Sequence, residues 1–455
     1  MRRGHVSGIY RPPAGAIATS RYGCKSEQIS ARRRISVFFF HDYESSGLTE
    51  PRGVQSLAEK PVGYTHARLT QAAASLTRRE KRDRLEVSYK TPKDPSYHPR
   101  FVISNLRWQI DEMLYSISCL CTQVVQQVHL DPSSNRELNI CHCAACQAVS
   151  GQICTPYYLL QENPQSENLA KYQQSDSVSR YFCGTCGSHV FSHSKHSGNW
   201  VVAAGLLDSP PQTQSIRHWG VDGTQDGGLS IFLPGSSGDK TVSCWLNPQT
   251  SIQDTIFGQL KAASRNSSQL LARCHCGGIE LYITRPDSTS EDPWSHWPDI
   301  IIPYNSGVSA ENEEDVKWWL CAGKTKYMAG TCACRTCRLA SGFPIQTWAF
   351  IPKSNILTAQ KKPLAYDVGT LKRYESSPEV YREFCSRCGA SVFWHCDKRP
   401  QLIDVSVGLL RADSGSRADE WLEWATGRTS FAEMAVDVSL IQQLEAGLKT
   451  WRQQT

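Results

Sequence analysis

The sequence lacks a hydrophobic run long enough to cross a membrane, which takes about 18 to 20 apolar residues. Short runs such as residues 35–40 fall far below that length. It also lacks a strong excess of one charge, since 49 Lys and Arg face 43 Asp and Glu. Basic residues outnumber acidic ones in residues 1–100 but not in the remainder, where nothing suggests the clustered basic residues that a nucleic-acid groove needs. We expect no membrane partner, and a nucleic-acid contact only through the basic head.

The N-terminus lacks the apolar core that a secretory signal peptide needs. The first 26 residues contain arginines and a lysine but no acid, a composition typical of mitochondrial transit peptides. Pro12, Pro13 and Gly15 would break an amphipathic helix there. We therefore expect residues 1–110 to be a disordered basic head with a short helix near residues 69–85, and the protein to be cytoplasmic, with mitochondrial import as the alternative.

Cysteine is abundant, with 19 residues. Disulfides in a secreted protein or metal thiolates inside a cell would both explain this number. Most of the cysteines form tight CxC and CxxC pairs. Neighbours at that spacing are poorly placed to bond to each other but well placed to hold one ion. The spacing favours metal binding.

The cysteines reveal an internal duplication, because three clusters recur in the same order. The first cluster is CxC, the second is CxCxxC followed by Ser-Gly, and the third is CxxCG preceded by Arg and Phe and followed by Val-Phe. In copy one they comprise Cys119 and Cys121, then Cys141, Cys143 and Cys146, then Cys183 and Cys186. In copy two they comprise Cys274 and Cys276, then Cys332, Cys334 and Cys337, then Cys385 and Cys388.

The residues around the clusters predict a mainly β fold. Residues 200–207 and 402–409 follow the third cluster with strand-type side chains and partial alternation. Each CxxCG is predicted to be a turn between strands, where Gly187 and Gly389 let the backbone reverse and point its amides at a bound thiolate. Copy two has extra residues before its CxCxxC, and residues 287–314 there are predicted to form an irregular surface loop.

The clusters predict two kinds of metal site. A structural zinc site takes four ligands, commonly from two short pairs distant in sequence. The sequence predicts one such set of Cys119, Cys121, Cys183 and Cys186 and another of Cys274, Cys276, Cys385 and Cys388. Three thiolates from one CxCxxC loop would instead leave a fourth coordination position open for chemistry, unless the loop is a labile structural site. His142 lies within the first such loop, but Ala333 holds the matching position, which argues against a required ligand.

The order CxC, CxCxxC and RxFCxxCG closely resembles the glutathione-dependent formaldehyde-activating enzyme family, also called the centromere protein V type domain. The resemblance covers residues near 113–235 and 268–430, with residues 236–267 as a linker. It implies all-β domains with a tent-like arrangement of sheets, similar to the Mss4-like fold. It also implies a structural zinc in each four-cysteine set and a second, glutathione-responsive zinc in each CxCxxC set, or about two to four ions per chain.

The reaction implied by the resemblance joins formaldehyde and glutathione into S-hydroxymethylglutathione, a carbon–sulfur lyase activity. Its catalytic candidates are Cys332, Cys334 and Cys337 in copy two and Cys141, Cys143 and Cys146 in copy one. The family's CxCG and CRxxxG patterns are intact in copy two but not in copy one, where Gln147 replaces Arg338. Because Arg offers a carboxylate a bidentate contact, Arg338 is the candidate for binding glutathione, the expected co-substrate.

Two other functions stay open from the sequence. The chain is either such an enzyme or a non-catalytic module in which every zinc is structural and the basic head contacts chromatin or microtubules. A thiol redox sensor is the third reading, because clustered thiolates release zinc on oxidation.

Overall fold

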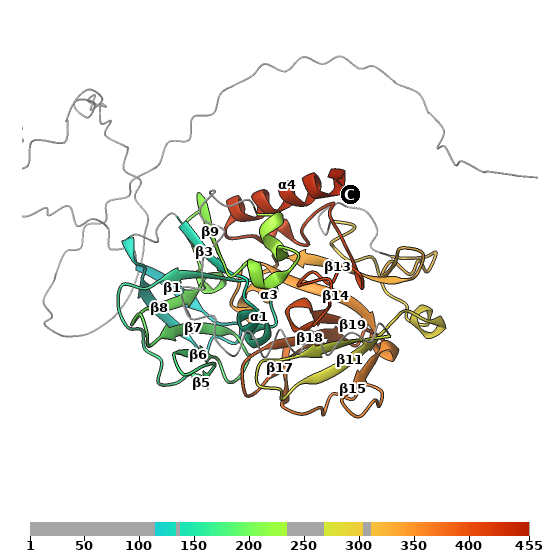
Figure 1. The fold of residues 1–455 in the computed structure, drawn as a ribbon, viewed down its shortest axis with the longest axis horizontal. Coiled ribbons are helices and arrows are strands. Elements are labelled where there is room, and N and C mark those ends of the chain that lie inside the picture. The colour runs from blue at the N-terminus through green and yellow to red at the C-terminus, as the bar shows by residue number, and fades with distance from the viewer. Residues whose placement is uncertain (1–113, 133–136, 234–267, 304–310, 455) are drawn as a thin grey trace, which may run out of the picture. The chain divides into compact units, whose positions relative to one another are not determined.

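The computed structural model describes residues 114–132, 137–233, 268–303 and 311–454 (Figure 1). The expectations for the head, for its helix near residues 69–85 and for the linker 236–267 lie outside these ranges. The described part is mainly β, which confirms the predicted class of two sheet-rich domains. It contains three α-helices, which are α1 (Ala144–Ser150), α3 (Arg335–Ser341) and α4 (Val438–Gln454). No helix within it has both the length and the apolar character needed to cross a membrane.

Copy one is built on a seven-stranded sheet with the order β5-β6-β7-β8-β4-β3-β9. A separate antiparallel hairpin, β1 (Leu114–Ser118) and β2 (Val125–His129), carries the CxC between its strands. The strands of the large sheet are β3 (Glu137–Cys141), β4 (Thr155–Leu159), β5 (Ala170–Gln173), β6 (Val178–Phe182), β7 (His189–Ser194), β8 (Trp200–Ala203) and β9 (Ser215–Trp219).

Copy two repeats this plan with longer strands. Its large sheet has the order β12-β13-β14-β19-β18-β17-β16, with β20 pairing parallel to β13, and a second sheet has the order β10-β11-β15. The strands are β10 (Gln269–Arg273), β11 (Glu280–Thr284), β12 (Leu320–Cys321), β13 (Lys326–Cys332), β14 (Gln346–Pro352), β15 (Ile356–Thr358), β16 (Leu371–Ser377), β17 (Val380–Cys385), β18 (Ser391–Cys396), β19 (Leu402–Ser406) and β20 (Leu422–Trp424).

Each CxxCG forms the predicted turn, between β6 and β7 in copy one and between β17 and β18 in copy two. Gly187 and Gly389 both have φ of 82°, a conformation that favours glycine. The Gly187 N–H donates to the Cys183 carbonyl at 2.9 Å, and the backbone of the next residue, Ser188, hydrogen-bonds the Cys186 thiol.

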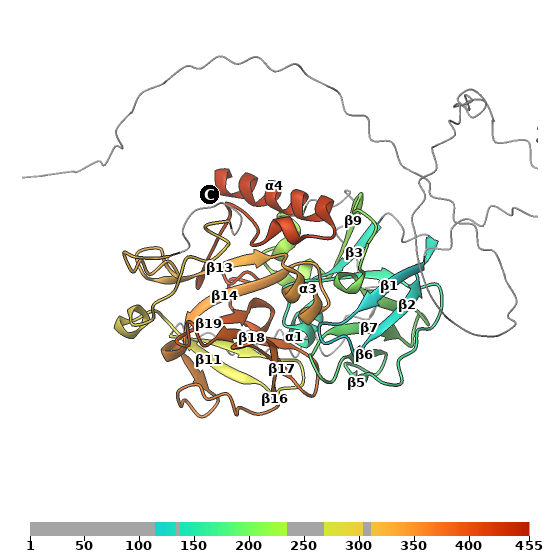
Figure 2. The same ribbon diagram turned by 180° about the vertical axis from the view of Figure 1, so that it is seen from behind.

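The two copies pack against each other through equivalent residues. In both views α1 and α3 lie between the two sets of strands (Figures 1 and 2). The Gly205 N–H donates to the Gly342 carbonyl at 2.9 Å, and in the matching contact the Gly408 N–H donates to the Gly151 carbonyl at 3.0 Å. These cross-copy bonds explain why the predicted strands end early: β8 and β19 turn into 3-10 helices, Ala204–Leu206 and Val407–Leu409, at Gly205 and Gly408.

Helix α4 extends copy two beyond the predicted end of its domain at residue 430. It buries Leu440, Leu444 and Leu448. Its first turn meets copy one, where the Ser439 hydroxyl donates to the Thr213 carbonyl at 2.7 Å. The helix therefore joins the two copies, which form one continuous core.

Candidate metal centres

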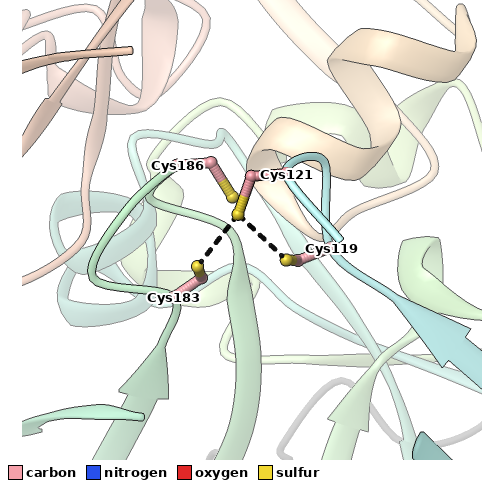
Figure 3. Close-up of side chains that lie close together, drawn as sticks. All are labelled: Cys119, Cys121, Cys183 and Cys186. Atoms are coloured by element: carbon pink, nitrogen blue, oxygen red, sulfur yellow. Dashed lines mark hydrogen bonds between the residues drawn. The ribbon is translucent and has the colours of Figure 1, made fainter. Parts of the chain in front are cut away.

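Two pairs of cysteines from distant turns meet in copy one (Figure 3). Their four sulfur atoms all lie within 4.8 Å of one another, and Cys121 Sγ lies 3.5 Å from both Cys119 Sγ and Cys183 Sγ. Disulfide sulfurs would be about 2.05 Å apart. Four thiolates around one zinc, with bonds of about 2.3 Å, would be roughly 3.7 Å apart. The observed spacing fits a metal, and all seventeen cysteines in the described ranges are free of disulfides.

The equivalent set in copy two comprises Cys274, Cys276, Cys385 and Cys388. Cys276 Sγ lies 3.5 Å from Cys274 Sγ and from Cys385 Sγ. Backbone amides support both sets, since the N–H of Val124 donates to Cys119 Sγ and that of Ile279 to Cys274 Sγ, each at 3.3 Å.

The thiols of these sets cannot all ionise side by side without a cation. Hydrogen bonding by Cys274 lowers the pKa of Cys276 to about 7. In the same set, hydrogen bonding with Cys274 raises the pKa of Cys388. Such opposite shifts arise when a few negative charges must be shared among close thiols, and a bound divalent cation would remove the conflict.

The CxCxxC clusters have one local design in both copies. Cys143 caps the N-terminus of α1 and accepts the Cys146 N–H at 3.4 Å. Cys334 caps α3 in the same way and accepts the Cys337 N–H at 3.3 Å. In each loop the three sulfurs lie within 4.8 Å of one another. His142 is outside the first cluster, because its Nε2 pairs with His218 Nδ1 at 2.9 Å.

An arginine reaches each three-thiol cluster from the RxFCxxCG motif. Arg180 Nη2 donates to Cys146 Sγ at 2.9 Å, and the equivalent Arg382 Nη2 donates to Cys337 Sγ at 3.5 Å. Both side chains are buried. The cluster's charge raises the pKa of Arg382, with Cys337 as the main raising contribution against the effect of burial. The sequence shows that this Arg recurs before both CxxCG motifs, but no role was predicted for it. Its recurrence beside predicted metal ligands could have indicated a contact with a metal site.

Arg338, the candidate glutathione contact, lies at the junction of the two copies. Its Nη1 donates to the carbonyls of Gly205 and Leu207 in copy one. A cavity lies beside Cys334, and Arg338 is not among the residues that line it. Gln147, its counterpart, likewise reaches the other copy and donates to Ser416 Oγ at 2.9 Å.

A cavity of about 550 Å³ opens beside the cluster of copy two, whose three cysteines line it. Aromatic side chains form much of its wall: Trp297, Trp318, Trp348, Phe350, Trp394 and Phe431. Arg335, Arg382, Lys398 and Arg399 add positive charge. Trp297 comes from the predicted insertion loop, residues 287–314, so this insertion shapes the site.

Two regions of the chain, residues 114–220 and 320–424, match the family model described as "Glutathione-dependent formaldehyde-activating enzyme". These two regions are tandem domains of that family. The second match begins after Cys274 and Cys276, which the structure nevertheless brings to Cys385 and Cys388. No curated protein and no solved structure matches the chain.

The first formaldehyde-activating enzyme domain covers its three-thiol cluster with its own chain. There β9 runs parallel to β3 as far as the pair Cys141 and Trp219. Gly220 then lies so close that a Cβ on it would be 3.0 Å from the Cβ of Cys143. In the second domain the equivalent strand β20 ends opposite Ala329, but parallel pairing with β13 resumes where Ser430 lies opposite Cys332 and accepts the Ala333 N–H at 2.9 Å. Ser430 thus matches Trp219 and Phe431 matches Gly220, and both Ser430 and Phe431 line the cavity.

Proposed function

We propose that the chain is a zinc-dependent carbon–sulfur lyase that makes and breaks the adduct between glutathione and a carbonyl compound, and that the second domain carries the reaction. The observation that carries this proposal is that Cys332, Cys334 and Cys337 line a cavity large enough for a small molecule. Membership of the formaldehyde-activating family supports the thiol and the carbonyl as reactants.

The four-thiol sets would hold structural zinc. They join the first hairpin of each domain to its CxxCG turn, which would tie together segments far apart in the sequence. The three-thiol sets would hold a zinc with an open position. When bound there, zinc supplies Lewis acidity, which favours the thiolate form of an added thiol and polarises a carbonyl oxygen.

The chain's own residues would bind and orient the reactants. Arg335 and Lys398 are exposed and line the cavity, so they are placed to meet the carboxylates of glutathione at its mouth. This role moves from Arg338 to these two residues, because Arg338 is engaged by carbonyls of the other domain. Arg382 would offset the negative charge of the thiolates.

The reaction is redox-neutral and reversible. In adduct formation the thiol sulfur bonds to the carbonyl carbon, the carbonyl π bond opens, and the thiol proton ends on the oxygen. In the lyase direction the same C–S bond breaks. No oxidant or reductant is consumed.

Exchange spectroscopy on formaldehyde and glutathione tests the proposal. The zinc-loaded protein should accelerate their exchange with the adduct, and removal of zinc by a chelator should abolish the acceleration. A protein that holds zinc, is folded and leaves the exchange rate unchanged would contradict the proposal and favour the non-catalytic module.

A further inference from the structure

The cavity beside the second cluster exceeds what formaldehyde requires. Formaldehyde has a single carbon, whereas the cavity measures about 550 Å³ and falls in the usual range for drug-sized ligands. Its walls are also unlike glutathione, whose backbone and carboxylates are polar. Glutathione alone can account for the size of the cavity, but the apolar walls call for a second, apolar component.

The aromatic wall is packed into a definite shape. Trp318 and Phe350 meet edge to face, with ring centroids 5.0 Å apart at 78°. Trp318 and Trp348 are each only 5% exposed. Rings held in this way present fixed faces and edges to a ligand. An aromatic ligand gains the most binding energy from such contacts.

Two arginines that line the cavity, Arg382 and Arg399, each carry a buried nitrogen with no hydrogen-bond partner among the described residues. Arg399 lies over the Trp394 ring at 4.7 Å, and its Nη2 donates to Asp404 at 2.6 Å. Its Nη1 is buried and has no hydrogen-bond partner among the described residues. Ligand cavities typically combine an apolar wall with a few such donors.

The first domain has no such wall at the equivalent positions. Tyr157 and Ser192 stand there in place of Trp348 and Trp394. The Tyr157 hydroxyl is engaged by Arg180 and is not free for a guest. The aromatic wall is therefore specific to the domain whose cluster opens on a cavity.

We propose that the second domain acts on aromatic carbonyl compounds, so that its adduct is the hemithioacetal of glutathione with an aromatic aldehyde. This inference rests on the proposed function and specifies its substrate class. The aromatic ring lies among Trp318, Trp348 and Trp394, and the carbonyl carbon faces the cysteine cluster. The thiol adds to that carbon and its proton passes to the oxygen, as in the general reaction.

Binding of stable adduct mimics tests this class without turnover. S-benzylglutathione carries an aromatic ring on the sulfur, and S-methylglutathione carries one carbon. By calorimetry the wild-type protein should bind S-benzylglutathione at least tenfold more tightly. In exchange spectroscopy benzaldehyde should be accelerated more strongly than formaldehyde, relative to the uncatalysed rates.

Two variants place the preference in the cavity. Trp394→Ala should reduce the preference for the benzyl compound about tenfold, while Trp200→Ala, which removes an indole from the first domain, should leave it unchanged. Ser377→Trp keeps the wall intact and adds bulk at an exposed position that lines the cavity. It should weaken the benzyl compound selectively, and it covers the case in which Trp394→Ala fails to fold.

The outcomes separate this inference from the proposed function. Acceleration of formaldehyde exchange with equal binding of the two mimics would overturn the aromatic class and leave the lyase standing. Unchanged exchange for both aldehydes would overturn both. A benzyl preference that Trp394→Ala and Ser377→Trp do not alter would place the ring elsewhere and overturn the inference.

Discussion

The two CxCxxC clusters carry the same ligands on the same cap, yet their surroundings differ. In the first domain Cys141 and Cys146 are at most 1% exposed, Cys143 is 9% exposed like its counterpart Cys334, and β9 and Gly220 pack against the loop. In the second domain the chain also returns to the cluster, at Ser430 opposite Cys332, but a cavity lined in part by insertion residues opens beside the three cysteines. Ligand spacing alone therefore does not decide whether a metal can reach a substrate. The chain segment packed over the ligands decides it.

The two copies are expected to have different roles. The copies contact each other around α1, α3 and α4, and the bonds at Gly205 and Gly408 are equivalent in the two copies. A duplicated chain with such a junction can keep one open cluster and use the other as a covered, structural one. The following predictions test how far the copies differ.

The largest effect is expected from deleting a ligand of a closed four-thiol site. Cys385→Ser should unfold the second domain, because zinc binding at such sites contributes apparent free energies of about 10–16 kcal/mol to folding. Cys183→Ser should do the same to the first domain. Thermal unfolding and elemental zinc analysis measure the effect. Wild-type melting temperature and zinc content in either variant would show that its site is not structural.

The junction between the copies should be the next most sensitive feature. Gly342 has φ of 86°, and a Cβ there would be 2.2 Å from the His189 carbonyl oxygen of the other copy. Gly342→Ala should cost roughly 3 kcal/mol of unfolding free energy, since strain adds to overpacking. The equivalent Gly151→Ala should cost about as much.

Gly198→Ala is the matched control for the junction. Gly198 also has a positive φ, of 74°, but nothing lies within 4 Å of the position that the added methyl group would take. It should cost only about 1 kcal/mol. Equal losses in urea unfolding for Gly198→Ala and Gly342→Ala would show that the copies do not need this contact.

Replacing the two buried arginines, Arg180 and Arg382, should have different effects on stability and on zinc retention. Arg180 donates to Ser192 Oγ at 2.7 Å in addition to Cys146 Sγ, whereas Arg382 contacts Thr336 and Cys337 near the cavity. Arg180→Met should lower stability by about 2–3 kcal/mol, because it leaves several buried polar groups unpaired. Arg382→Met should cost less stability but weaken zinc retention at the second cluster. Chemical unfolding and competitive chelation distinguish the two, and the reverse order would contradict the comparison.

The smallest effect is expected at Arg338. Arg338→Gln copies the residue of the first domain and removes hydrogen bonds to Gly205 and Leu207, so it should cost about 1–2 kcal/mol. Glutathione affinity by calorimetry should not change. A clear loss of affinity with unchanged stability would return the glutathione contact to Arg338.

The sequence allowed the grouping of the cysteines to be predicted. Cysteine spacing is local, and a CxC and a CxxCG that recur in order predicted the sets that include Cys119 with Cys183 and Cys274 with Cys385. The turns at Gly187 and Gly389 followed from the same motifs. Such predictions succeed because ligand spacing and turn geometry depend on a few neighbouring residues.

The junction and the cavity could not be predicted in the same way. Gly205 and Gly342 are far apart in the sequence, and nothing in either segment identifies its partner. The cavity gathers Trp297, Trp348 and Trp394 from an insertion and two separate strands. Arg338 lies beside the ligands in sequence, but the direction of its side chain depends on the packing of the copies.

The central claim is that the second domain alone holds an open, reactive cluster, and the pair Cys334→Ser and Cys143→Ser tests it most directly. Each variant removes one ligand from a CxCxxC and leaves the four-thiol sets intact. Exchange spectroscopy of glutathione with formaldehyde and with benzaldehyde should show activity abolished by Cys334→Ser and largely retained by Cys143→Ser. Equal loss in both variants, or loss only in Cys143→Ser, would contradict the account.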